Sequence, residues 1–342
     1  KIGDDPTKDN ITSGELDLRD NLFWSFGSSN ANSSSGNAQA FFTETDRNNT
    51  FADPMFGNYT IAQGLNPLPQ AGSPALGSGR DEIADGFFCD VDFKGAFGGV
   101  NWAAGWTILV ESGWMTDAAA GIPDYPLKGG AVVTVTDADI DGDVTWTADN
   151  EYVLDGFVFV EDGETLTIEA GTVVRGKPGE GANASALIVA RGGKIFANGT
   201  AEAPVIFTAE DDDLSDPSDF GPGDVGEWGG LILLGKATLN SPEASGTPIV
   251  DNIEGIPTTE PRGQFGGTDD DDSSGSLRYV SVRHGGSNIG ANNEINGVTF
   301  GGVGRGTVVE FIEVFANKDD GFEFFGGTVQ AKYLVASYCG DD

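Results

Sequence analysis

The feature that most constrains the fold is a repeat near the C-terminal end of the sequence. Three short apolar runs resemble one another, at residues 279–282, 311–314 and 333–336. The last two begin 22 residues apart (333 − 311), and the acid pairs at 319–320 and 341–342 have the same offset. Strand-rich repeats with periods of about 20–50 residues are typical of solenoids, in which successive coils stack. The repeat therefore predicts a β-solenoid.

The remainder of the C-terminal two thirds extends this pattern. From residue 131, short β-branched runs alternate with Asp- and Gly-containing turns, and only two acidic loops, 210–227 and 241–276, interrupt them. A second echo, FGG at 300–302 and 325–327, is 25 residues apart and predicts that these two turns stack. Short strands without intervening helices favour an all-β, right-handed parallel β-helix with long acidic loops. A β-sandwich is the alternative.

The N-terminal third has a different character. Residues 1–116 are weakly periodic and rich in turns, so we interpret them as a segment that closes or caps the solenoid, joined by a linker, 117–130, to the coils, 131–342. Residues 102–114 (WAAGWTILVESGW) predict one short helix. The tryptophans in it predict a hydrophobic cap over one end of the solenoid, the alternative being a platform on which sugars stack.

The composition excludes some partners. The chain has 54 acidic against 18 basic residues, a formal charge of −36. Such a surface repels nucleic acids and anionic membranes. No apolar run approaches the length of a membrane span, so membrane insertion is not expected. The acids either attract divalent cations, with Ca²⁺ as the expected ion, or form a solvated surface.

Several motifs indicate a family. They are TLTIEAGTVVRG (165–176), ALIVARGGKIFANGTAEAPVIFTA (186–209), EWGGLILLGKA (227–237) and LRYVSVRHGG (277–286). In these motifs the chain resembles bacterial secreted right-handed parallel β-helix proteins of the cell surface, common in Bacteroidetes-like lineages. These proteins share a solenoid architecture with pectate lyases. The resemblance implies an extracellular or cell-surface location.

The order of the segments departs from the pattern of that family. Residues 50–114 also resemble it, through DPMF, NPLPQAGSPAL, FKGAFGG and NWAAGWT. Family members carry this segment after the coils, whereas here it precedes them. Three interpretations remain open: circular permutation, a window cut from a tandem array, or a polymer in which the coil ending at Asp342 meets the segment beginning at Lys1 of a neighbour. The last predicts a filament of copies of this chain.

Two acidic motifs are candidate metal sites. Asp137, Asp139, Asp141 and Asp143 have the carboxylate spacing of the first half of a calcium loop, with a glycine at the bend. The acid expected at the twelfth position is missing, because Ala148 stands there. The second candidate is the acidic run Asp269, Asp270, Asp271 and Asp272. A solvated turn is the alternative for both.

The pairs Asp319–Asp320 and Asp341–Asp342 are the candidate catalytic residues. One coil apart, they are predicted to stack and either share a cation or act as an acid/base pair, as clustered carboxylates do in glycosidases. Only Lys318 lies near them in sequence. His284, the sole histidine, cannot form a zinc site alone and predicts packing.

Two cysteines, Cys89 and Cys339, leave open one disulfide or two free thiols. Together these observations predict a non-catalytic extracellular structural protein, a subunit of a self-assembling surface filament or an adhesin, stabilised by calcium. Surface glycans are further candidate partners. The alternative is a carbohydrate-active β-helix enzyme, either a polysaccharide hydrolase or a lyase.

Overall fold

The computed structural model divides the chain into two compact units. The first unit consists of Lys1–Trp102 and Gly113–Ala118, and the second of Ala103–Ser112 and Ala119–Asp342. The predicted capping segment, 1–116, is therefore shared between the units, and the predicted linker lies outside the described residues except for Gly130. The structure describes residues 13, 19–24, 47–77, 79, 86–116, 130–216, 218–240, 249–290 and 293–340.

Among its described residues the first unit contains two small two-stranded sheets. Strands β1 (Leu22–Phe23) and β2 (Thr50–Phe51) pair in parallel, and the Phe23 and Phe51 rings stack 5.3 Å apart. Strands β3 (Phe56–Asn58) and β4 (Asn66–Pro69) pair antiparallel across the 3₁₀ turn η2 (Ile61–Gln63). Within the described residues β4 pairs on one side only, as its two prolines require, because proline cannot donate to a second ladder.

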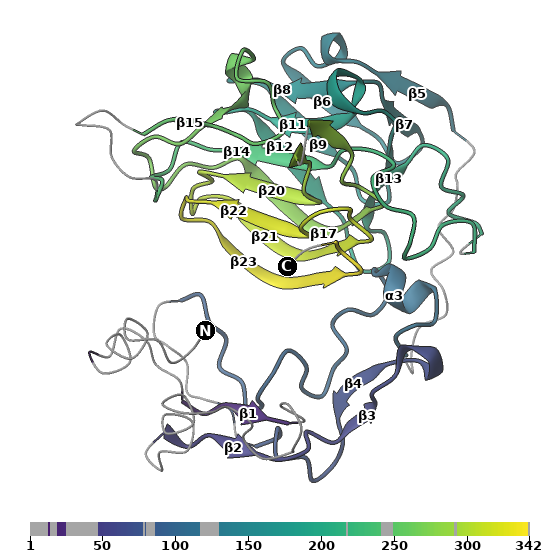
Figure 1. Ribbon diagram of the computed structural model, residues 1–342, viewed down its shortest axis with the longest axis vertical. Coiled ribbons are helices and arrows are strands. Elements are labelled where there is room, and N and C mark those ends of the chain that lie inside the picture. The colour runs from purple at the N-terminus through teal and green to yellow at the C-terminus, as the bar shows by residue number, and fades with distance from the viewer. Residues whose placement is uncertain are drawn as a thin grey trace. The chain divides into compact units, whose positions relative to one another are not determined.

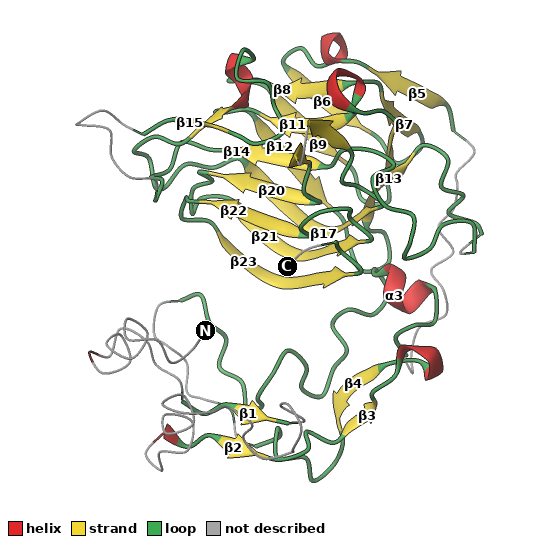
Figure 2. Ribbon diagram, viewed as in Figure 1, coloured by secondary structure: helices red, strands yellow, loops and turns green. Residues whose placement is uncertain are grey.

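The second unit is a right-handed parallel β-helix built from three columns of short strands, which confirms the predicted fold (Figures 1 and 2). Every strand pair between coils is parallel. The first column is β5 (Val132–Val135), β7 (Glu151–Leu154), β10 (Val173–Gly176) and β13 (Val205–Ala209); the second is β6 (Asp143–Trp146), β9 (Thr165–Ile168) and β12 (Lys194–Asn198); the third is β8 (Phe157–Val160), β11 (Ala186–Val189), β14 (Leu231–Leu234), β20 (Val298–Gly301) and β22 (Phe322–Phe325).

In the last coils one long strand replaces the first two columns. These strands are β17 (Gly275–Arg283), β21 (Val308–Phe315) and β23 (Gln330–Ser337). Short elements decorate the turns and loops: α3 (Ile108–Glu111), η3 (Asp137–Asp139), η4 (Gly181–Asn183), β15 (Asp251–Asn252), η5 (Pro261–Gly263), β16 (Gln264–Phe265), β18 (Asn288–Gly290) and β19 (Asn293–Glu294). No helix among the described residues is long and apolar enough to cross a bilayer.

The 22-residue repeat predicted from the sequence equals the offset between paired residues in the last two coils. Ile312 pairs with Leu334, 22 residues on. The bend in each long strand falls on an aromatic residue with positive φ: Tyr279 (48°), Phe311 (60°) and Tyr333 (57°). Their rings stack with centroids 4.4 and 4.3 Å apart. Stacking offsets the strain of a left-handed conformation, which is rare for residues with large side chains.

The FGG echo gave a register that is wrong by one residue. Phe300 pairs with Phe324, not Phe325, and the rings of this pair stack 4.9 Å apart. The offset is therefore 24 residues (324 − 300). The ladder follows the positive-φ glycines, Gly302 and Gly326, which are also 24 apart. The doubled phenylalanine at 324–325 concealed this register in the sequence.

The short helix predicted within 102–114 is confirmed as α3. The preceding Trp106 is fully buried and meets the Tyr279 and Phe311 rings edge-on, at 5.8 and 6.3 Å. Segment Ala103–Ser112 therefore covers the outer side of β17 and β21. Trp102 instead stacks on Phe97 in the first unit, at 5.0 Å. Both cysteines are free thiols.

Candidate functional site

Segment Ala103–Ser112 encloses a chain of buried polar groups on the outer face of β17 and β21. Arg283 donates from Nε to Ser281 (2.8 Å) and from Nη2 to Glu111 Oε1 (2.9 Å). Ser281 in turn donates to Glu313 Oε2 (2.6 Å), which also accepts the amide of Ile108 (3.0 Å). All four side chains are at most 9% exposed. We call these four residues the buried ion network.

The pairing register of β17 with β21 brings two members of the buried ion network side by side. Ser281 pairs with Glu313 in the next coil, and Val335 follows in the coil after that. These three residues hold the same position in the three predicted repeats, and only the last is apolar. The polar residues Ser281 and Glu313, at a position within otherwise apolar runs, were the sequence signal for this network. The prediction from sequence did not use it.

Burial dominates the protonation of Glu313. It raises the pKa of this carboxyl to about 7, although Arg283 and the hydrogen bonds from Ser281 and Ile108 act in the opposite direction. Removal from water disfavours the charged form more than these partners favour it. A group that titrates near neutrality often marks a functional site. Here Glu313 is fully buried, and its hydrogen bonds join segment Ala103–Ser112 to strands β17 and β21.

The sole histidine also lies in this region. His284 is fully buried, donates from Nδ1 to the carbonyl oxygen of Asp224 (2.7 Å), and contacts the Phe220 and Phe315 rings edge-on. Burial lowers its pKa. His284 and Arg283 line a cavity of about 30 Å³, which has room for about one water molecule. This packing matches the role that we predicted for His284.

A second group of acids interacts electrostatically with the predicted Asp319–Asp320 pair. Burial raises the pKa of Glu254, and the charges of Asp319, Asp320 and Glu294 raise it further. The pKa of Glu323 is raised by burial and by the same aspartates. We call these five residues the acidic cluster. The pair that was predicted to stack on Asp319–Asp320, namely Asp341–Asp342, lies outside the described residues. The predicted stacking therefore stays a prediction.

Lys318 and Asn296 each contact a member of the acidic cluster. Lys318, the basic residue predicted nearby, lies 3.7 Å from Glu294. Asn296, which is 2% exposed, donates to Glu323 Oε2 (2.5 Å), while its own Oδ1 is buried without a hydrogen-bond partner. A carboxyl group with a raised pKa beside other carboxyl groups is a combination that general acid/base chemistry uses.

The first predicted calcium motif serves as a set of hydrogen-bond acceptors. Asp137 accepts the amide of Phe159 (3.0 Å) and pairs with Arg262 (2.8 Å). Asp139 accepts both the amide and the hydroxyl of Thr136, which fixes the turn η3. Asp141 is exposed in the following turn and Asp143 begins β6. The first two members thus already bind protein donors.

The second motif serves as loop support in the same way. Asp270 accepts the amide of Thr238 (3.0 Å), and Asp272 accepts the amide of Lys236 (2.8 Å). Asp271 pairs with Arg305 (2.9 Å), and the backbone of Asp269 bonds to that of Lys236 (2.9 Å). Within the described residues no three His, Cys, Asp or Glu side chains are grouped as metal ligands. Calcium binding stays a prediction.

The geometry defines a class of protein: a parallel β-helix solenoid whose outer side is partly covered by a segment from earlier in the chain. Comparison with protein families matches residues 138–342 to the family described as "Pectate-lyase like beta helix domain". This match spans more than half of the chain, which therefore belongs to that family. No curated protein and no solved structure matches the chain.

Proposed function

We propose that this chain is a non-catalytic structural protein of the cell surface, in which the β-helix acts as a stiff rod and copies assemble into a filament or an adhesive layer. The observation that carries this proposal is the use of the acidic motifs. Asp137, Asp139, Asp270 and Asp272 all accept backbone amides, from strand β8 in the case of Asp137 and from turns or loops in the other three. Side chains engaged in this way hold turns together and are poorly suited to bind a substrate.

Strand β22 offers a surface for another copy. Among the described residues it pairs on one side only, with β20. Phe324, in β22, continues the stack from Phe300 and is 45% exposed. A strand from a second copy would extend both the hydrogen-bonded ladder and this ring stack. Exposed sheet edges commonly pair with strands of other chains in this way.

Charge would control this assembly. Two copies that each carry −36 repel one another, and mobile ions screen that repulsion. Divalent cations would act at lower concentration than sodium, and this would be the calcium dependence of the proposed filament. An extracellular location fits the proposal, because calcium is abundant there.

Electron microscopy and sedimentation velocity test the proposal on the full chain. We expect larger assemblies in CaCl₂ than in NaCl of equal ionic strength, and their loss on addition of a chelator. Phe324→Ser should weaken assembly, whereas Val100→Ser, at a position 73% exposed in the first unit, should not. Monomers alone at every concentration in both salts would overturn the proposal.

The acidic cluster supports a second candidate, a carbohydrate-active enzyme. Its raised pKa values suit Glu254 or Glu323 to protonating a glycosidic oxygen. Release of reducing ends from a panel of acidic and neutral polysaccharides tests this. Activity that falls about 100-fold or more in Glu323→Gln, but not in the exposed Asp143→Asn, would support the enzyme. Absence of release from every polysaccharide would contradict it.

A further inference from the structure

Segment Ala103–Ser112 packs on the β-helix although its neighbours in the sequence belong to the first unit. Trp102 and Gly113, on either side of it, are both part of that unit. The segment pairs with no strand in the described part of the chain, and its single helical turn, α3, forms backbone hydrogen bonds within itself. Side-chain contacts, and not a strand ladder, therefore attach it to β17 and β21.

Two glycines bracket the most deeply inserted part of this segment. Gly105 (φ 84°) and Gly113 (φ 69°) both adopt the left-handed conformation that residues with side chains rarely adopt. Between them Trp106 is fully buried against the Tyr279 and Phe311 rings. A few residues at the ends of a moving element can absorb the backbone rotations that its motion needs, so the two glycines are suited to act as hinges.

The polar contacts of the segment converge on two side chains of the β-helix. Glu313 Oε2 accepts hydrogen bonds from the Ile108 amide of the segment (3.0 Å) and from Ser281 of β17 (2.6 Å). Its Oε1 is buried without a hydrogen-bond partner. Arg283 binds Glu111 of the segment (2.9 Å). One oxygen of Glu313 thus joins the segment to the strands, and the surroundings of the other suit a neutral carboxyl group better than a carboxylate.

Ionisation of Glu313 would weaken this attachment. The charged groups that face Glu313 are Arg283 of β17, which favours its ionised form, and Glu111 of α3, which disfavours it. Burial has the largest effect and raises the pKa of Glu313 to about 7. An opened segment would admit water to Glu313 and return its pKa toward 4.5, so the open state would gain population as the carboxyl group ionises.

We propose that residues 103–112 form a clasp that opens separately from the β-helix and that closes most firmly when Glu313 is protonated. Opening would break the links from Ile108 to Glu313 and from Glu111 to Arg283 and would withdraw Trp106 from the rings, while every strand ladder stays intact. This is local opening, which involves few backbone hydrogen bonds and therefore takes place without unfolding of the core.

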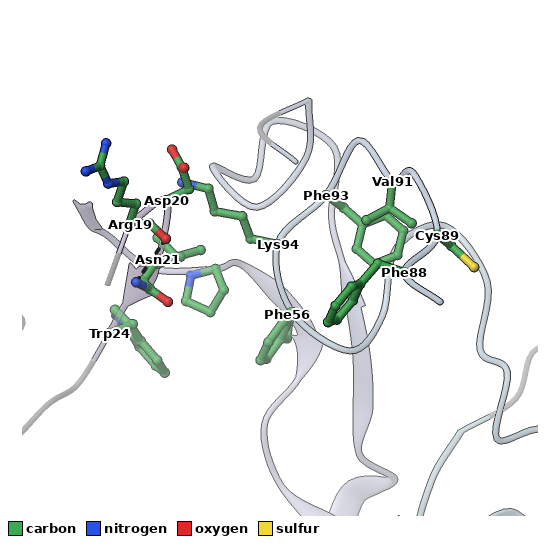
Figure 3. A pocket seen from close by; sticks show the side chains of 13 residues that line it. Arg19, Asp20, Asn21, Trp24, Phe56, Phe88, Cys89, Val91, Phe93 and Lys94 are labelled. Carbon is green, nitrogen blue, oxygen red and sulfur yellow. Dashed lines mark hydrogen bonds between the residues drawn. The ribbon is translucent and has the colours of Figure 1, made fainter. Parts of the chain in front are cut away.

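The clasp would also control one attachment of the first unit to the β-helix, because both of its ends continue into that unit. The first unit holds a cleft of about 610 Å³, with Phe88 and Phe93 on one side and Arg19 and Asn21 on the other (Figure 3). When the clasp is closed, the chain that carries this cleft is fastened to β17 and β21. Opening would release that fastening.

Hydrogen exchange of the full chain, followed by mass spectrometry, tests the proposal. The amides of Ile108, Val110, Glu111 and Ser112 are hydrogen-bonded in the closed clasp, so their protection factors report its opening. Relative to Glu313→Gln, which cannot ionise, their protection in the wild type should fall by about 50- to 100-fold between pH 4.5 and 7. The comparison with Glu313→Gln also cancels the titration of buried His284, whose lowered pKa acts with the opposite sign.

The matched control is Glu310→Gln, three residues earlier on the same strand and at a half-buried position. Glu310 pairs with Arg278 (3.4 Å), outside the buried ion network. This variant should leave the pH dependence of clasp protection as it is in the wild type.

A disulfide lock supplies a second variant, should Glu313→Gln be poorly folded. A Cβ at Gly105 would lie 3.8 Å from that of Ala201, the usual separation in a disulfide. In a background with Cys89→Ser and Cys339→Ser, the pair Gly105→Cys and Ala201→Cys should protect the clasp about tenfold or more when oxidised than when reduced, at pH 7. The reduced form carries the same strain at the positive φ of position 105 and is therefore the control.

Three results would overturn the proposal. Clasp amides that exchange as slowly as those of β11, with the same dependence on urea, would mean that the segment opens only when the whole β-helix unfolds. Equal pH dependence of clasp protection in the wild type and in Glu313→Gln would mean that Glu313 does not control the clasp. Equal protection in the oxidised and reduced forms of the lock would mean that the segment has no separate opening to prevent.

Discussion

Two arginines of the second unit bind acids by the same chemistry in opposite surroundings. Arg283, 2% exposed, reaches Glu111 directly and Glu313 through Ser281. Arg262, whose side chain is 28% exposed, pairs with Glu260, Asp137 and Glu161 at 2.8 Å each. Its guanidinium also lies 3.8 Å from the centre of the Phe159 ring.

The pKa values of the acids show what the surroundings decide. Glu260, which binds Arg262 directly where water has access, has a pKa lowered to about 2. Glu313, which is enclosed and separated from Arg283 by a serine, has a pKa raised to about 7. Direct pairing favours the charged form, and desolvation disfavours it. Both acids lie near an arginine, so the extent of burial decides whether pairing or desolvation has the larger effect on the pKa.

Removal of Arg283 should have the largest effect on stability. Arg283→Ala leaves the carboxylate of Glu111 buried without this cation, and breaking a buried pair in this way costs about 3–5 kcal/mol. Urea unfolding followed by tryptophan fluorescence measures the loss.

A combined variant sharpens this result. Arg283→Met with Glu111→Leu and Glu313→Leu replaces the charges by apolar groups and should restore most of the lost stability. An Arg283→Ala protein as stable as the wild type would mean that the buried ion network contributes nothing.

The pH dependence of Glu313 should be the next largest effect. Its pKa in the folded protein, about 7, lies above the ordinary value of 4.5. The folded state therefore holds the proton more tightly, so this contribution to stability is complete below pH 4.5 and is lost as the pH rises through about 7. The difference amounts to roughly 3 kcal/mol.

Glu313→Gln isolates this contribution from the other acids. The variant keeps an oxygen for Ser281 and Ile108 but cannot ionise, so its stability relative to the wild type should rise between pH 4.5 and 7 and then stay level. Urea unfolding at a series of pH values measures the difference. A constant difference across that range would show that Glu313 does not titrate there.

The Arg262 cluster should give the smallest effect. Arg262→Ala removes three partly solvated ion pairs and a ring contact, and we expect a loss of about 1–2 kcal/mol, measured by the same unfolding assay. Arg305→Ala is the matched control, because the Arg305 side chain is 52% exposed and also pairs with two acids. That control should lose less than about 1 kcal/mol. Equal losses would break the proposed dependence on burial.

Much of the fold could be predicted because a β-helix is locally periodic. The 22-residue offset appears directly as the pairing of Ile312 with Leu334. The register of the third column was missed by one residue, since two adjacent phenylalanines offered two alignments and only the ladder selects Phe324.

Less of the candidate sites could be predicted, because they depend on contacts between distant residues. Glu111 and Arg283 are 172 residues apart, and Ile108 and Glu313 are 205 apart. No local pattern indicates such pairs. Likewise, Asp137 belongs to a motif with the spacing of calcium ligands and Asp270 to a dense acidic run, but neither pattern reveals whether a backbone amide already binds the carboxylate oxygens.

Local sequence patterns specify the solenoid and the repeat of its last coils, because the alternation of inward and outward residues is set every few residues along each strand. The surroundings that shift the pKa values of Glu260 and Glu313 in opposite directions arise only in the tertiary structure. The carboxyl group of a glutamate is chemically the same wherever it occurs in a sequence. Its pKa and its partners depend on which distant segment excludes water from it. For Glu313 that segment is Ala103–Ser112, which lies some two hundred residues earlier in the chain.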